Sequence, residues 1–160
     1  MRAIGLLALL ASVITTPALA GSWKFDPDDH GHVLLTYSED SKVTFMLGCG
    51  HAFVLRVKYP GKAAKNGGAS IVIASGNANM TLKGDFEEPS DEFATTFTQA
   101  DLGYRRQDPG LYEKTWEKLR DRLLDLLDSG KSLTISAGGN SYGLPPIAAP
   151  GWRKALGECG

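Results

Sequence analysis

The stretch that decides the fold is VTFMLGC at residues 43–49, followed by FVLRVKY at residues 53–59. In both segments every second residue is apolar, and the second segment places Arg56 and Lys58 between its apolar residues. Successive side chains of a strand point to opposite faces, so this spacing predicts two half-buried strands. Such a pair is typical of an antiparallel sheet with one face toward a core.

Further strands are predicted on both sides of this pair, from alternation and from turn residues. They cover residues 32–38, 70–74, 79–83 and 93–97, and a hairpin joins 131–137 to 141–144. One helix is indicated by apolar residues at three- and four-residue intervals from Tyr112 to Leu127, with Asp108 and Pro109 suited to its start and Gly130 to its end. A short helix is expected near residues 150–158. We therefore expect a mainly β (α+β) fold, an antiparallel β-sheet or small sandwich with one long amphipathic helix and a short C-terminal helix.

The first twenty residues have the pattern of a secretory signal peptide. Arg2 supplies the positive region, residues 4–14 form the apolar run, and Ala18 to Ala20 form a small-x-small cleavage site. The apolar run is shorter than the roughly 20 residues that span a membrane, so an anchor is not favoured. We expect residues 21–160 to be a single globular domain, periplasmic or secreted, without stable membrane insertion.

Composition narrows the classes of protein and partner. The 160 residues are 42% hydrophobic and contain only 2 Cys, which argues against a disordered chain and a disulfide-dense scaffold. The 17 basic and 18 acidic residues give a formal charge of −1. A chain this close to neutral has no basic surface for a polyanion, so we expect no nucleic-acid partner.

The two cysteines predict one disulfide, Cys49–Cys159, because an exported chain reaches an oxidising compartment. Cys49 shares the apolar side of its strand and should point inward. The bridge would join the end of the chain to the sheet, and closing a loop of about 110 residues contributes on the order of 4–5 kcal/mol in the chain-entropy model. Two free thiols are the alternative.

The three histidines of the chain suggest a second possibility. His30, His32 and His51 lie close to Cys49 in sequence, and imidazole and thiolate are ligands that zinc and copper favour. This indicates a candidate metal site at the three histidines, from which a disulfide would remove Cys49. Three ordinary histidines without metal are the plainer interpretation, and no other cofactor is indicated.

One sequence motif matches the pattern of a catalytic site. Residues 139–143, Gly-Asn-Ser-Tyr-Gly, match the G-x-S-x-G pattern of a nucleophile elbow, which requires a helix directly after the serine. Pro145 and Pro146 follow instead, and no His lies downstream. We therefore assign no catalytic residue, although a hydrolase without a recognisable motif remains an alternative.

Three segments, together with the export signal and the strand that carries Cys49, carry a family resemblance. The segments are residues 132–136 (SLTIS), 142–145 (YGLP) and 155–159 (ALGEC). They resemble small proteobacterial exported β-proteins of the invasion-associated locus B type, which tend to end in a strand pair and a short helix. The resemblance implies a periplasmic, non-catalytic protein and supplies no functional residue.

The sequence as a whole favours an exported, non-enzymatic binding or accessory protein whose partner is an envelope protein or a small ligand. A metal-binding protein that uses His30, His32 and His51 is one alternative, and a hydrolase is another. We expect the binding surface on a sheet face or on the loops. Candidate residues for that surface are Trp23, Tyr59, Tyr104 and Arg105.

Overall fold

The structure is a computed structural model that describes residues 21–27, 32–50, 53–62, 68–87, 90–93, 96–99 and 109–158. The strands are β1 (Ser22–Pro27), β2 (Val33–Glu39), β3 (Lys42–Cys49), β4 (Phe53–Lys58), β5 (Gly68–Ser75), β6 (Ala78–Glu87), β7 (Thr96–Gln99), β8 (Leu133–Ala137) and β9 (Asn140–Leu144). The helices are α1 (Pro109–Leu127) and α2 (Trp152–Gly157). The predicted signal peptide, residues 1–20, lies outside the described residues. Within them, no helix is both long enough and apolar enough to cross a membrane.

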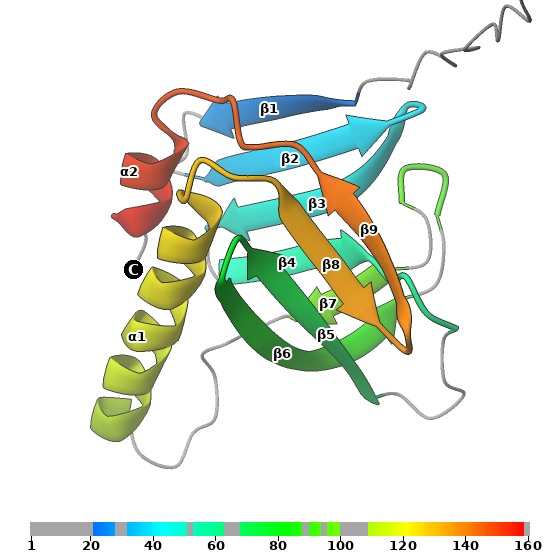
Figure 1. Ribbon diagram of the computed structural model, residues 1–160. Helices are drawn as coiled ribbons and strands as arrows, with labels where there is room; N and C mark the ends of the chain where they lie inside the picture. The colour runs from blue at the N-terminus through cyan, green and yellow to red at the C-terminus, as the bar shows by residue number, and fades with distance from the viewer. Residues whose placement is uncertain are drawn as a thin grey trace, which may run out of the picture.

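All nine strands belong to one curled sheet in the order β1-β2-β3-β4-β7-β6-β5-β8-β9, with antiparallel neighbours throughout. Figure 1 shows that the curl brings β8 and β9 across β3 and β4, while α1 and α2 lie together beside one end of the sheet. Helix α1 packs against β5, β6 and α2, and α2 packs against β2. The prediction of a mainly β, antiparallel fold is confirmed, and the chain forms a single curled sheet.

The strand boundaries lie within two residues of the predicted ones in β2 to β5 and in the β8–β9 hairpin, whereas β6 extends beyond its predicted end at residue 83 to Glu87. Two tight turns explain much of this register. Asp40 and Ser41, between β2 and β3, have positive φ values of 50° and 65°, and Gly138 and Gly139, between β8 and β9, have values of 56° and 79°. Two consecutive residues with positive φ form the hairpin turn whose twist matches that of the flanking strands.

The sequence missed one strand and misplaced another. Strand β1 was not predicted at all, because its two apolar residues alternate with charged ones over only six residues that end at Pro27. The strand predicted at 93–97 is β7, which begins at Thr96, and Phe93 makes only an isolated parallel bridge to Val43. The pairing of β7 with β4 and β6 sets its register, and that pairing is invisible in the local pattern.

The core lies inside the curl. The alternating inward residues of β2 to β8 are buried, among them Leu35, Phe45, Leu55, Ile71, Ile73, Leu82, Phe97, Leu133 and Ile135, each at most 2% exposed. Burying a side chain of this size stabilises the fold by about 1.5–3 kcal/mol. Helix α1 contributes four more buried leucines, Leu123, Leu124, Leu126 and Leu127. The side chains of α1 are described over 117–127, where these leucines lie opposite exposed residues such as Asp121 and Asp125.

The two edge strands of the curled sheet, β1 and β9, are not paired with each other by backbone hydrogen bonds, and a side-chain contact connects them instead. Trp23 in β1 donates its Nε1 hydrogen to the carbonyl oxygen of Pro145, just after β9, at 3.1 Å. Its ring packs against Tyr37 and Phe45 with centroid separations of 5.0 and 5.4 Å. Pro145 and Pro146 have no N–H to donate, so strand pairing does not continue along β1.

Candidate functional site

Each of three neighbouring strands carries three consecutive apolar residues. The triplets are Val33-Leu34-Leu35 in β2, Phe45-Met46-Leu47 in β3 and Phe53-Val54-Leu55 in β4. The outer members of each triplet face the core, so the central residue must point to the opposite face of the sheet. Leu34, Met46 and Val54 therefore share the outer face, where a solvated antiparallel sheet ordinarily carries polar residues.

The register places these three residues together. Leu34 pairs with Gly48, which in turn pairs with Val54, while Met46 pairs with Arg56 in the next outward-facing row. With their neighbours they form a shallow hollow of about 460 Å³, which we call the outer depression. Its lining residues are Asp26, His32, Val33, Leu34, Met46, Gly48, Cys49, Val54 and Arg56. Leu34, at 37%, is the one large hydrophobic residue that is exposed among the residues whose burial is described.

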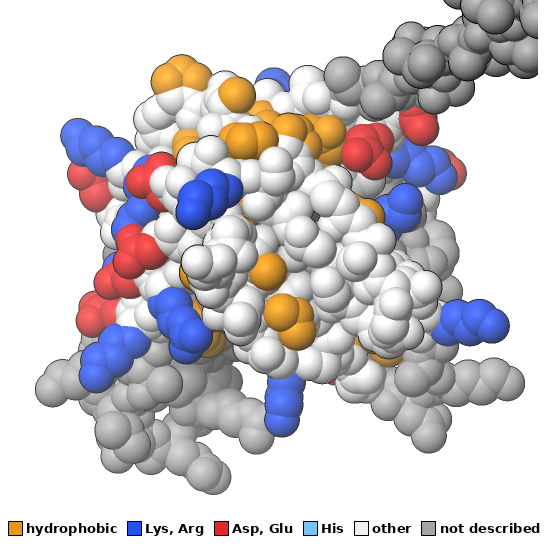
Figure 2. All heavy atoms as spheres, in the orientation of Figure 1, with side chains coloured by type: hydrophobic (Ala, Val, Ile, Leu, Met, Phe, Trp, Pro, Cys, Tyr) orange, Lys and Arg blue, Asp and Glu red, His pale blue; other side chains and the backbone are white. Residues whose placement is uncertain are grey.

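The other half of the sheet has a different outer face. Strands β6, β8 and β9 place exposed Thr81, Lys83, Thr134 and Ser141 outward. Figure 2 shows one view of this half: the surface over β8 and β9 is largely polar, and hydrophobic side chains gather along the upper margin, over β1 and the segment after β9. Outward apolar residues also occur on β5, at half-buried Val72 and Ala74, but those of β2 to β4 line the outer depression. Apolar surface of this kind, rimmed by polar residues, is a candidate interaction site.

Arg56 forms the positive margin of the outer depression. Its Nη2 donates to Oε1 of Glu87 at 3.1 Å, and its guanidinium carbon lies 5.5 Å from the ring centroid of Phe93. The carboxylate and the ring fix a side chain that is 34% exposed. Its buried Nε has no hydrogen-bond partner, and neither has the buried Oγ1 of Thr98, which lies opposite Arg56 on β7.

Asp26 forms the negative margin, on β1 at the opposite side of the outer depression from Arg56. It accepts a hydrogen bond from Nζ of Lys24 at 2.7 Å, and both side chains are more than half exposed. The site therefore has an apolar floor between two charges of opposite sign. Each charge already has a neighbour of the other sign, so neither margin presents a bare charge.

The predicted metal site is described only in part. His32 is exposed and lines the outer depression, whereas His30 and His51 lie outside the described residues. The described residues contain no group of three or more His, Cys, Asp or Glu side chains that could hold a metal ion. The three-histidine site therefore stays a prediction.

The predicted disulfide also reaches beyond the described residues. Cys49 is buried at the end of β3, as expected from its place in the alternation, and the described part of the chain contains no free cysteine. Cys159 lies outside the described residues, so the Cys49–Cys159 pairing stays a prediction.

Of the four aromatic and basic surface candidates, the two that the structure describes, Trp23 and Tyr59, do not line the outer depression. Trp23 is partly buried and hydrogen-bonded to Pro145. Tyr59 is half-buried and meets the ring of Phe86 edge-on at 4.7 Å. Tyr104 and Arg105 lie outside the described residues. Ser141 of the G-x-S-x-G match lies within strand β9, so the strand–turn–helix of a nucleophile elbow is not formed there.

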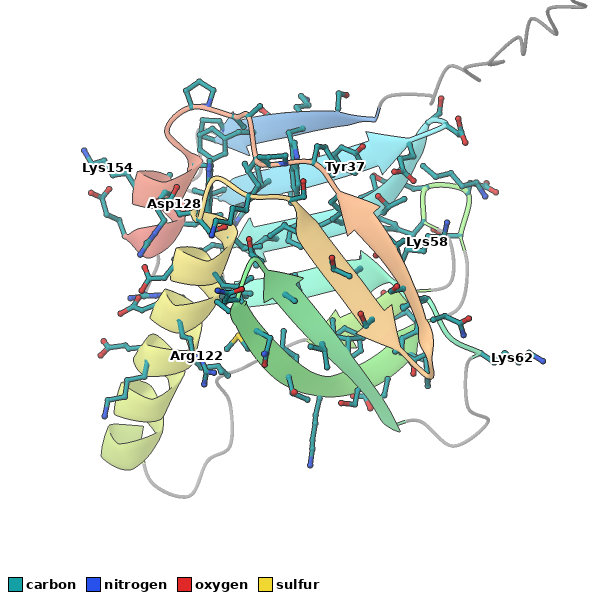
Figure 3. The ribbon with its side chains drawn as sticks, in the orientation of Figure 1. Tyr37, Lys58, Lys62, Arg122, Asp128 and Lys154 are labelled. Carbon is teal, nitrogen blue, oxygen red and sulfur yellow. The ribbon has the colours of Figure 1, made fainter. Side chains whose placement is uncertain are left out.

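A second hollow, of about 700 Å³, lies between α1 and the β5–β6 turn. Its lining is mostly polar and charged, and it includes Arg122, whose Nη2 donates to the carbonyl oxygen of Asn79 at 3.3 Å. Figure 3 shows Arg122 projecting from α1 toward the sheet. A third, of about 580 Å³, lies beside α2 between Asp128 and Lys154. The second hollow lacks an apolar floor. The third has apolar Ala149, Pro150 and Trp152 beside charged Asp128, Arg153 and Lys154, but it lies beside a helix and not on a sheet face.

Comparison of the chain with protein-family models, with curated proteins and with solved structures finds no match in any of the three. The resemblance to the invasion-associated locus B type therefore stays an expectation from sequence.

Proposed function

We propose that the chain is an exported, non-enzymatic binding or accessory protein whose binding surface is the outer depression. The observation that carries this is that β2, β3 and β4 each turn an apolar residue outward and that these three residues line one hollow, whereas β6, β8 and β9 turn polar residues outward. Removal of the signal peptide, a periplasmic or secreted location, and the Cys49–Cys159 disulfide complete the proposal and rest on the sequence.

The shape of the outer depression favours a partner with an apolar surface of its own. A pocket for a small molecule encloses most of its ligand, and this hollow is a shallow one on a sheet face. The floor supplies the apolar contact, and the charges of Asp26 and Arg56 at its margins supply orientation. A macromolecular surface meets such a face more completely than a small ligand does.

We also propose that α1 is amphipathic over its whole length, with Tyr112 and Trp116 continuing the stripe of buried leucines. This supports the binding role indirectly. A helix that packs on its own sheet leaves the outer face of β2 to β4 as the apolar surface open to a partner.

The test uses the fluorescent anion anilinonaphthalenesulfonate as a probe of exposed apolar surface on the folded protein. We expect the dye to bind the native protein, and Val54→Thr to weaken that binding about fivefold, because the new hydroxyl must lose water on contact with the probe. Val72→Thr is the matched control, since Val72 is a half-buried outward valine on β5. Equal effects of the two substitutions, or no dye binding by the folded wild type, would contradict the proposal.

A further inference from the structure

We propose that cleavage after Ala20 creates an ion pair inside the folded protein, in which the new α-ammonium group of Gly21 binds the carboxylate of Glu39 beside the hydroxyl of Tyr37. The inference rests on the proposed removal of the signal peptide and adds what the freed end of the chain does. Processing then stabilises β1, the strand that carries Asp26 at one margin of the outer depression.

The register of β1 and β2 brings Gly21 to Glu39. Ser22 lies opposite Ser38, and the pairing continues from there to the end of β1. One further step in the same register places Gly21 opposite Glu39, the last residue of β2. Figure 1 shows the start of β1 beside the end of β2. The residue that follows the cleavage site is therefore held against β2.

The hydroxyl of Tyr37 lies between the two groups. It makes polar contacts with the backbone N–H of Gly21 and with the carboxylate of Glu39. Tyr37 is buried, and its ring packs against Trp23 with a centroid separation of 5.0 Å, so the hydroxyl has little freedom to move. The nitrogen of Gly21 is thus directed toward Tyr37 and Glu39 while it is still part of a peptide bond.

Position 21 accepts only glycine. A Cβ atom there would lie 2.5 Å from Cζ and from the hydroxyl oxygen of Tyr37, and 2.5 Å from the carbonyl oxygen of Ser38. The backbone comes this close to Tyr37 because the residue has no side chain. Gly21 also directly follows the small-x-small site expected for cleavage. The close approach and the expected cleavage site therefore coincide at one residue.

Cleavage changes the charge at this point. Hydrolysis of the Ala20–Gly21 peptide bond by an export peptidase adds one water: the hydroxyl goes to the carbonyl carbon of Ala20 and the hydrogen to the nitrogen of Gly21. An α-amino group has an ordinary pKa of about 8, so at neutral pH the new amine takes up a proton and is mostly an ammonium. It then has three hydrogens to donate instead of one.

Glu39 is suited to receive this charge. Its side chain is half-buried, and among the described residues no salt bridge includes it, although Lys42 lies opposite it on β3. The ammonium of Gly21 can keep its contact with Tyr37 and donate a second hydrogen to Glu39. Hydrogen bonds between charged groups are roughly twice as strong as those between neutral ones.

The first measurement is the mass of the protein that a bacterial host exports from the full chain. We expect the exported protein to begin at Gly21. Any other first residue would overturn the proposed cleavage site and this inference together. The binding surface has its own test in dye binding, which does not depend on the first residue.

The second measurement compares two forms of the protein released from a fusion, one beginning at Gly21 and one that keeps residues 17–20. In the longer form the nitrogen of Gly21 is an uncharged amide. We expect Glu39→Gln to lower the equilibrium constant for folding about fivefold in the shorter form and less than about twofold in the longer one. Glu117→Gln, at an exposed glutamate of α1, is the matched control and should change neither form.

Urea denaturation gives these equilibrium constants, and circular dichroism checks that each variant is folded. Equal effects of Glu39→Gln in the two forms would overturn the inference, because Glu39 would then act through Tyr37 alone. That result, with Gly21 as the first residue and Val54-dependent dye binding intact, leaves both the cleavage site and the binding surface standing. A larger effect in the form that begins at Gly21, without dye binding, would overturn the binding surface and support the ion pair.

Discussion

The hydroxyl of Tyr142 in β9 donates a hydrogen bond to the carbonyl oxygen of Lys58 at the end of β4, at 2.8 Å. These strands are not neighbours in the sheet, so the bond joins two parts of the curl that no backbone ladder connects. The carbonyl oxygen of Thr44 lies 3.4 Å from the same hydroxyl. Thr44 is the extra residue of a bulge opposite Tyr37 and Ser38, and it is buried. Figure 3 places Lys58 at this end of the sheet, beside β9.

Removing this hydroxyl should loosen the curl. We expect Tyr142→Phe to lower the free energy of unfolding by about 1 kcal/mol, the usual net value of one hydrogen bond. Urea denaturation measures the change. Tyr59→Phe is the matched control: this half-buried tyrosine packs edge-on against Phe86, and the loss of its hydroxyl should cost less than about 0.5 kcal/mol. Equal losses in the two variants would contradict a joining role for Tyr142.

The same hydroxyl predicts a loss of stability at high pH. Burial, and secondarily the negative charge of Glu39, raise the pKa of Tyr142 above its ordinary value. Above about pH 10 the unfolded chain releases this proton while the native state keeps it, so stability falls as pH rises. Tyr142→Phe has no such hydroxyl to titrate. The difference in free energy of unfolding between wild type and this variant should therefore shrink by about 1 kcal/mol per pH unit above about pH 10. Urea midpoints at rising pH measure this, and a deficit that stays constant would show that the pKa is ordinary.

Burial also raises the pKa of Tyr37, with Glu39 again adding to the effect. This second tyrosine remains in the Tyr142→Phe variant, so the variant should still lose stability at alkaline pH, though less steeply than wild type.

The buried hydroxyl of Thr98 should be dispensable. Its Oγ1 has no hydrogen-bond partner, and the residue is 4% exposed. Replacing an unpaired buried polar atom by a methyl group of similar shape removes an unfavourable desolvation term. We expect Thr98→Val to leave the free energy of unfolding unchanged or to raise it by up to about 1 kcal/mol. A loss greater than that in urea denaturation would show that the hydroxyl has a stabilising partner.

The predicted disulfide has its own test. If Cys49 and Cys159 are joined, Cys159→Ser should lower the free energy of unfolding by on the order of 4 kcal/mol, because the unfolded chain regains the freedom of a long loop. Reduction of the wild type should produce the same loss, and Cys159→Ser should not respond to reductant. Mass spectrometry of an unreduced digest would detect the linked peptides directly. Alkylation of both thiols in the native, unreduced protein would contradict the pairing.

The sequence predicts those parts of the fold in which local alternation and tertiary pairing agree. Strands β3 and β4 could be predicted because their apolar residues repeat every two positions. Strand β1 could not, since Trp23 and Phe25 stand among charged residues in a short segment. Its place depends on pairing with β2 and on the bond from Trp23 to Pro145, which joins residues 122 positions apart.

The sequence alone indicates only part of the candidate site. The three apolar triplets around Leu34, Met46 and Val54 can be read directly, and they could have indicated an apolar outer face. That Gly48 lies between Leu34 and Val54 follows only from the register. The contact between Arg56 and Glu87 spans 31 positions, and no local pattern indicates it.

The position of the binding surface is tested most directly by nuclear magnetic resonance, with anilinonaphthalenesulfonate titrated into isotope-labelled protein. We predict that the largest shift changes occur at Leu34, Met46, Gly48, Val54 and Arg56. The chemical shifts of residues in the second hollow, between α1 and the β5–β6 turn near Asn79 and Arg122, should change little. Largest changes in that hollow, with the outward residues of β2 to β4 unaffected, would contradict the outer depression as the binding surface.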